Sequence, residues 1–162
     1  MTNASGPLTG IRVVDLTTAV SGPVAAVILA DQGADVTKIE PPGGDFMRAA
    51  GPEAGMNPTF VACNHGKRSI VLDLKQQGAA EILWRLIESA DVLIQNFRPG
   101  AIERLGFGAS TVAARNPRLV YLSISGVGES GPYSGKRVYD PVVQALGGLA
   151  DIQADPQTGR PR

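Results

Sequence analysis

Residues 11–45 constrain the fold more than any other part of the chain. A short apolar run at 11–16 is followed by a turn at 17–22, an apolar small-residue segment at 24–32, and an alternating run at 34–40 that two prolines end. This order predicts a strand, a helix and a second, parallel strand. In an open parallel sheet, ligands bind beyond the carboxyl ends of the strands, and the first turn is the usual place. That turn lacks the Gly-x-Gly-x-x-Gly of a dinucleotide site, which disfavours a nicotinamide-dependent oxidoreductase.

The rest of the chain repeats the alternation of strands and helices. We expect strands at 69–74, 91–95 and 118–125 and a long irregular loop at 43–57, with Ser21 capping the first helix. The pattern predicts an α/β fold, a Rossmann-like open and mostly parallel sheet with helices on both faces. The remaining helices are expected at residues 58–64, 78–90, 101–105, 111–115 and 140–149.

Composition excludes several classes of function. The chain has 162 residues, enough for one domain with a core, and 15 basic residues balance 15 acidic ones, so no net charge draws it to nucleic acid or a membrane. No apolar run is long enough to span a bilayer, and the first residues do not resemble a signal peptide, so we expect a cytoplasmic protein. The single cysteine, Cys63, excludes an internal disulfide and is expected to be a buried small side chain. The lone histidine, His65, is expected to form hydrogen bonds in a loop, and no metal site is expected.

Cationic side chains follow several of the predicted strands. Lys75, Arg98, Arg104 and Arg137 all lie in segments that come after a strand, close to expected helix starts. Because the carboxyl ends of parallel strands share one edge, these cations and the free backbone amides would suit a polyphosphate. The alternative is that they are ordinary solvated charges at the ends of loops. Asp140 fits the cap or first turn of a helix better than a catalytic role.

Six blocks of sequence resemble the family III CoA-transferases, also called the CaiB/BaiF family. This group includes formyl-CoA, carnitine and bile-acid CoA-transferases and the α-methylacyl-CoA racemases. The similarity covers residues 8–150 in a consistent order. The blocks are LTGIRVVDLTTAVSGP, LADQGADVTKIEPPGGDFMR, NHGKRSIVLDLK, LIESADVLIQNFRPGAIERLGF, NPRLVYLSISGVGESGPYSGK and YDPVVQALGGL.

The resemblance implies that residues 1–150 form part of a large Rossmann-like domain that binds coenzyme A or acyl-CoA as substrate, and that 151–162 are a truncated loop or linker. It implies no covalently bound cofactor, a carboxylic acid as acceptor, and an interlocked homodimer for full-length members. Pro41 stands where some relatives carry an arginine. The residues that the resemblance assigns to coenzyme A binding are Val20, Ser21, Leu72, Lys75, Asn96, Phe97, Arg98, Arg104 and Arg137.

The resemblance also implies a mechanism in which an aspartate carries the transferred group as an aspartyl-CoA thioester. That aspartate is expected beyond Arg162, so we expect an N-terminal fragment that is inactive alone. The polar Arg-Pro-Arg ending, with no closing element, is expected to be a cut. An alternative is a non-catalytic module that binds coenzyme A or a partner and is completed by a separate C-terminal chain. The racemase function is disfavoured because Tyr139-Asp140 stands where racemases carry His-Asp.

Overall fold

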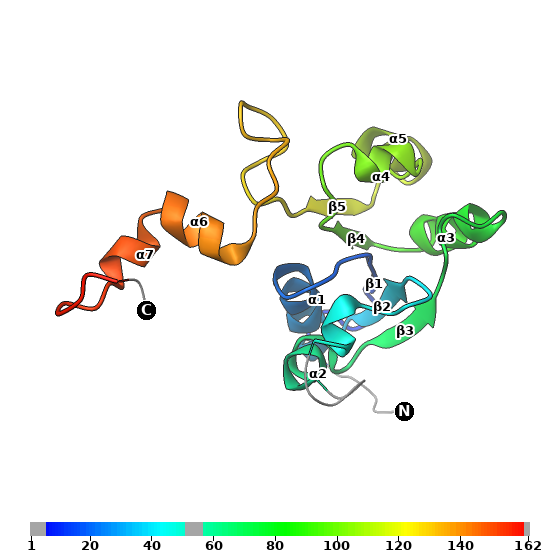
Figure 1. The fold of residues 1–162 in the computed structure, drawn as a ribbon. Coiled ribbons are helices and arrows are strands. Elements are labelled where there is room, and N and C mark those ends of the chain that lie inside the picture. Colours follow the sequence, from blue (N-terminus) through cyan, green and yellow to red (C-terminus); the bar gives the residue numbers. More distant parts are fainter. Residues whose placement is uncertain (1–5, 51–56, 161–162) are drawn as a thin grey trace. The chain divides into compact units, whose positions relative to one another are not determined.

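The computed structural model describes residues 6–50 and 57–160, and its centre is a five-stranded sheet (Figure 1). The strand order is β3-β2-β1-β4-β5, and every neighbouring pair is parallel. The predicted α/β fold with an open parallel sheet is therefore confirmed. The strands are β1 (Arg12–Asp15), β2 (Asp35–Glu40), β3 (Arg68–Val71), β4 (Val92–Gln95) and β5 (Val120–Ser123). The helices are α1 (Ser21–Asp31), the 3-10 helix η1 (Phe46–Arg48), α2 (Pro58–Asn64), α3 (Ala79–Glu88), α4 (Ala101–Arg104), α5 (Ala109–Arg115), α6 (Asp140–Leu146) and α7 (Leu149–Ile152).

The strand order contains a reversal beside β1. The chain adds β2 and β3 on one side of β1, and then places β4 and β5 on the other side. The loops that leave β1 and β4 therefore diverge at the carboxyl edge, and such a point in an open parallel sheet forms a crevice for ligands. The order thus predicts a binding site between β1 and β4 before any side chain is considered.

Apolar side chains cover both faces of the sheet. Val14 on β1 belongs to a core cluster that includes Leu83 and Ile87 of α3, whereas the adjacent Val13 belongs to a second cluster that includes Ala26 of α1. Neighbouring residues of a strand point to opposite faces, which explains the two clusters. Burial on both faces fixes the register of β1 and so the position of the turn that follows it.

Several element ends differ from the sequence-based expectations. Helix α1 begins at Ser21 with Val20 as its N-cap and no side-chain cap, so the prediction that Ser21 caps this helix is wrong. The expected strand 69–74 ends at Val71, and Asp73 closes a turn by accepting a hydrogen bond from the amide of Lys75. The expected irregular loop contains η1, although its residues 51–56 lie outside the described part. The expected helix 140–149 is interrupted after Leu146, where two successive glycines separate α6 from α7.

The chain divides into two compact units between Ile124 and Ser125. The first unit contains the whole sheet and the helices up to α5, and the second contains α6 and α7. Within the described residues, no helix has both the length and the apolar character needed to cross a membrane.

Candidate ligand site at the carboxyl edge of the sheet

The turn after β1 is joined directly to the residue that follows β4. The Asn96 side chain accepts a hydrogen bond from the amide of Thr18 at 3.0 Å and donates one to the Thr18 carbonyl at 2.8 Å. These reciprocal bonds connect the two loops that diverge at the strand-order reversal. The structure therefore brings Asn96 close to the turn that carries Val20 and Ser21, three of the residues expected at the site.

The turn itself has an unusual backbone. Ala19 has a φ of 68°, which makes it the one non-glycine residue with positive φ among those described. Gly22 packs so closely on Thr17 that a β-carbon at Gly22 would lie 2.3 Å from the Thr17 β-carbon. The first amides of α1 have no side-chain cap, and a helix N-terminus with free amides favours an anion. The turn thus presents backbone donors where the topology predicts a ligand.

A buried ammonium group supports the start of this turn. The Lys38 side chain, on β2, is 2% exposed, and its Nζ donates to the Thr17 carbonyl at 2.7 Å. It also forms an ion pair with Asp45 at 3.0 Å. Asp45 in turn accepts a hydrogen bond from the amide of Met47 and begins η1. Lys38 therefore connects the β1–α1 turn to the loop that follows β2.

A second buried ammonium supports the other end of the turn. Lys67 donates from Nζ to Asp15 at 2.9 Å, to the Pro23 carbonyl at 2.9 Å and to Asn64 at 3.0 Å. These three acceptors use all the donors that an ammonium has. Burial lowers the pKa of Lys67, and the neighbouring Asp15 carboxylate partly opposes this effect. Asp15 completes the link, because its other oxygen accepts hydrogen bonds from the amide and hydroxyl of Thr17.

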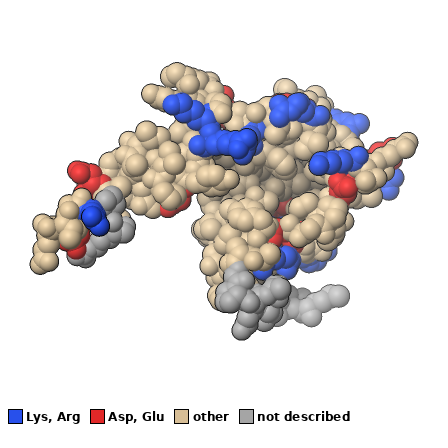
Figure 2. Space-filling model, in the orientation of Figure 1, with Lys and Arg blue, Asp and Glu red and all other residues tan. Residues whose placement is uncertain are grey.

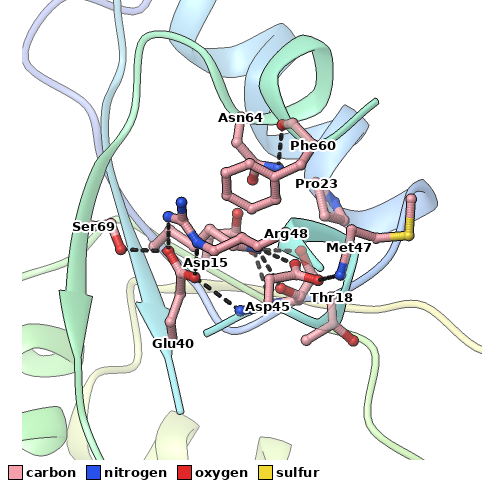
Figure 3. A network of polar contacts seen from close by, with 12 residues as sticks. Asp15, Thr18, Pro23, Glu40, Asp45, Met47, Arg48, Phe60, Asn64 and Ser69 are labelled. Carbon is pink, nitrogen blue, oxygen red and sulfur yellow. Dashed lines mark hydrogen bonds and ion pairs between the residues drawn. The ribbon is translucent and has the colours of Figure 1, made fainter. Parts of the chain in front are cut away.

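The loop after β2 is held by a third ion pair, shown in Figure 3. Arg48 donates two hydrogen bonds of 2.7 Å to Glu40, and its guanidinium lies 4.0 Å from the centre of the Phe60 ring. Glu40 also accepts hydrogen bonds from Ser69 and from the amide of Asp45. These bonds, led by the one from Arg48, lower the pKa of Glu40 to about 2. The loop that carries Pro41 is thereby fixed against the sheet, although Pro41 itself is exposed.

The other predicted site residues divide into packed and exposed groups. Leu72 and Phe97 are half-buried and pack against the same core cluster, so their side chains contribute to the core. Lys75, Arg98 and Arg104 are exposed, and within residues 6–50 and 57–160 none of them forms an ion pair. The Arg104 guanidinium lies back over the loop after β4, 3.0 Å from where a β-carbon of Gly100 would be.

Distance along the sheet separates some of these cations. Lys75 follows β3 and Arg98 follows β4, and β2 and β1 lie between these two strands. Three strand spacings of about 4.8 Å give roughly 14 Å. A single ligand that reaches both must therefore be extended. Arg137 is exposed and belongs to the second unit. Figure 2 shows basic side chains at several separate places on the face in view.

A hollow of about 200 Å³ lies elsewhere in the first unit. Its lining includes Arg12, Asp35 and Arg68, which are the first residues of β1, β2 and β3. It is therefore at the amino edge, opposite the end of the sheet where parallel strands place their ligands. Arg68 is paired with Asp35 there, and the hollow does not belong to the candidate site.

Sequence reasoning missed the buried ionic residues under the turn. In the run 34–40, apolar and polar residues alternate, and Lys38 and Glu40 are the polar residues near its end. This alternation was the available sign that these two side chains share one face of the strand. Their partners Asp45, Arg48 and Lys67 lie on separate loops, and no spacing rule predicts the pairing.

Cys63 and His65 contribute none of the hydrogen bonds described for this network. Cys63 is buried, as expected. His65 contacts the Ala62 carbonyl and Asp31 at 2.9 Å each. The described residues contain no group of three His, Cys, Asp or Glu side chains that could hold a metal.

The strand order and the reversal beside β1 define an α/β protein with a Rossmann-like open parallel sheet. The family model described as CoA-transferase family III matches residues 8–162, and the chain belongs to this family. It is 47% identical to acetyl-CoA:oxalate CoA-transferase of Acetobacter aceti over 89% of this chain and 38% of the relative. It is 42% identical to succinate–glutarate CoA-transferase of Agrobacterium fabrum over 99% of this chain and 42% of the relative.

Comparison with solved structures supports the same family. The crystal structure of a CaiB/BaiF family protein from Brucella suis superposes with a TM-score of 0.91 at 39% identity, over 98% of this chain and 43% of that one. The chain thus spans about two fifths of the length of the relatives it matches.

Proposed function

We propose that this chain is the coenzyme A-binding part of a CoA-transferase that moves CoA from an acyl-CoA to a carboxylic acid. The observation that carries the proposal is the open N-terminus of α1 at the strand-order reversal. Beside it, Arg98 on the loop after β4 and Arg104 at the end of α4 are exposed and form no ion pair with any residue that the structure describes. The family assignment supports this ligand, and two relatives carry names with oxalate or glutarate as acid.

The chain's own residues would bind and orient the nucleotide end of the substrate. The amides of Val20 and Ser21 face a diphosphate as uncharged donors, and the helix dipole adds to their effect. Arg98 and Arg104 suit bidentate contacts with phosphate oxygens, whereas Lys75 acts as a point charge. The separation between Lys75 and Arg98 fits coenzyme A, because its phosphates and adenosine are spread along an extended molecule.

The chemistry proposed for the family begins when an aspartate carboxylate attacks the thioester carbonyl and CoA leaves as thiolate. The resulting mixed anhydride is attacked by the thiolate, which releases the donor acid and leaves an aspartyl-CoA thioester. The acceptor carboxylate then repeats the two exchanges in reverse order. The aspartate is proposed to follow Arg162 in the complete protein, so this chain binds CoA without turnover. Backbone amides of residues 126–131 are candidates for binding the oxyanions.

A second candidate is a non-catalytic module that a separate chain completes. The exposed apolar side chains of α6 and α7 favour it, since Leu146 is 68% and Ile152 80% exposed. Large apolar surface of this kind marks an interaction site. A chain carrying the C-terminal part of the relatives would cover it. For both candidates we propose that the whole protein is a homodimer and lies in the cytoplasm.

Calorimetric titration with coenzyme A tests the binding claim. Arg104→Met is expected to weaken binding about tenfold, because a charge-assisted hydrogen bond to phosphate is lost. Arg118→Met is the matched control, since Arg118 is also exposed but precedes β5 at the opposite edge. No binding of CoA at millimolar concentration by the folded chain, or equal effects of the two variants, would contradict the proposal. Acyl transfer by the chain alone would show that the nucleophile is within residues 1–162.

A further inference from the structure

The β1–α1 turn holds an alanine in a conformation that alanine disfavours. Ala19 has a φ of 68°, in the left-handed region that glycine adopts freely and other residues avoid. Glycine at this position would form the turn without strain. A disfavoured backbone conformation persists only where the surroundings enforce it, and such sites are concentrated where ligands bind. In this turn, side chains from outside the turn hold the residues beside Ala19.

Two side chains hold the residues that precede Ala19. Lys38 donates to the Thr17 carbonyl at 2.7 Å. Asn96 binds both backbone polar groups of Thr18, at 3.0 Å and 2.8 Å. Because these contacts come from β2 and from the end of β4, the turn cannot change without losing bonds to two strands. Both side-chain polar atoms of Asn96 are used in this way, so its amide is engaged with the protein backbone.

We propose that Asn96 and Lys38 are positioning residues, which hold Ala19 in the left-handed conformation so that the amides of Val20 and Ser21 face coenzyme A. The inference rests on the proposed function for the identity of the ligand. It differs from the contact role that the family resemblance implies for Asn96, because it assigns the Asn96 side chain to the turn and the ligand contacts to the backbone. Substitution of Asn96 should therefore act through the shape of the turn.

The test uses the full chain, calorimetric titration with coenzyme A and amide hydrogen exchange. Asn96→Ala is expected to weaken CoA binding about tenfold, in the range seen when a supporting contact is removed from a site. It should also speed exchange of the Thr18 amide in the free protein. Asn116→Ala is the matched control, because the Asn116 side chain also donates to backbone carbonyls, those of Ile87 and Ala90, before β4 begins. It should change CoA affinity by less than about twofold, since it lies at the other edge of the sheet.

Rescue and a second variant separate positioning from general destabilisation. Asn96→Ala combined with Ala19→Gly should bind CoA more tightly than Asn96→Ala alone, because glycine needs no enforcement to adopt positive φ. Ala19→Val, which keeps Asn96 and Lys38, should weaken CoA binding, and it decides the question if Asn96→Ala does not fold. Failure of rescue, equal affinity of the Asn96→Ala and Asn116→Ala proteins, or full affinity of the Ala19→Val protein overturns the inference. Absence of CoA binding by the unaltered chain contradicts the proposed function instead, and the exchange of the Thr18 amide still reports whether Asn96 holds the turn.

Discussion

Replacing Lys67 by methionine should destabilise the first unit strongly. The side chain is 1% exposed and its three donors are all used. Its removal leaves the Asp15 carboxylate, which is fully buried, without a cation. Breaking a buried pair from one side costs about 3–5 kcal/mol, because the remaining charge is neither hydrated nor paired. This is a large fraction of the roughly 5–15 kcal/mol by which domains are stable.

The expected shift in melting temperature follows from the size of the unit, which ends at Ile124. An unfolding entropy of about 2.1 cal/mol/K per residue gives about 0.25 kcal/mol/K for such a unit. The Lys67→Met protein should therefore melt about 12–20 °C lower in a calorimetric or circular dichroism scan. Lys75→Met is the control. Lys75 is exposed and forms no ion pair among the described residues, so its replacement should change stability by less than about 0.5 kcal/mol.

The double variant isolates the charge from the packing. With Asp15→Asn added to Lys67→Met, no unpaired charge is buried, and part of the lost stability should return. A loss below about 1 kcal/mol in the single variant would refute the reasoning, because it would mean that the Asp15 carboxylate is stabilised without Lys67.

Two further perturbations test the same edge of the sheet. The pKa of Glu40 is about 2 in the folded chain, against an ordinary value of 4.5, so the unfolded chain binds the proton more readily. The ionised Glu40 therefore stabilises the fold fully above about pH 4.5, and this stabilisation is lost as the pH falls toward 2. Glu40→Gln should therefore flatten the fall in Tm between those pH values, and an unchanged slope would contradict the assignment. Gly22→Ala should lower the free energy of unfolding by at least about 2 kcal/mol, because the new β-carbon would overlap Thr17. Gly43→Ala is the control, because a β-carbon there meets nothing within 4 Å, and it should change the free energy of unfolding by less than about 0.5 kcal/mol. Equal urea midpoints for the two variants would show that Thr17 moves aside freely.

The order of elements could be predicted because each has a local cause. Helix α2 was predicted with the bounds that the structure shows. The structure gives the local cause, because Pro58 is its first residue and the Asn57 side chain caps it. The run at 11–16 was recognisable as a buried strand because four of its six residues are Ile, Val or Leu and a glycine and a turn bound it. The order of strands within the sheet is not a local property, and only the structure shows the reversal beside β1.

The candidate site could be predicted only in part. Residues such as Arg98 were found because they follow a strand, which the sequence displays. The role of Asn96 depends on a hydrogen bond to Thr18, 78 positions away, and the role of Lys38 depends on a carbonyl 21 positions away. Long-range pairs of this kind carry no periodicity, so no pattern in one sequence indicates them. The expected boundary at residue 150 stays a prediction, as does the contact of each assigned residue with coenzyme A.

The way the β1–α1 turn is held has a consequence for protein engineering. A glycine-rich phosphate loop is a portable motif, because its conformation is encoded in its own residues. The segment from Thr17 to Pro23 is different, because its backbone is held by side chains from elsewhere in the chain. These come from β2, from the segment before β3 and from the residue after β4. Transplanting these residues onto another α/β scaffold would transfer the sequence of the turn but not its backbone conformation. The smallest unit that could be grafted is the central part of the sheet together with its ionic residues.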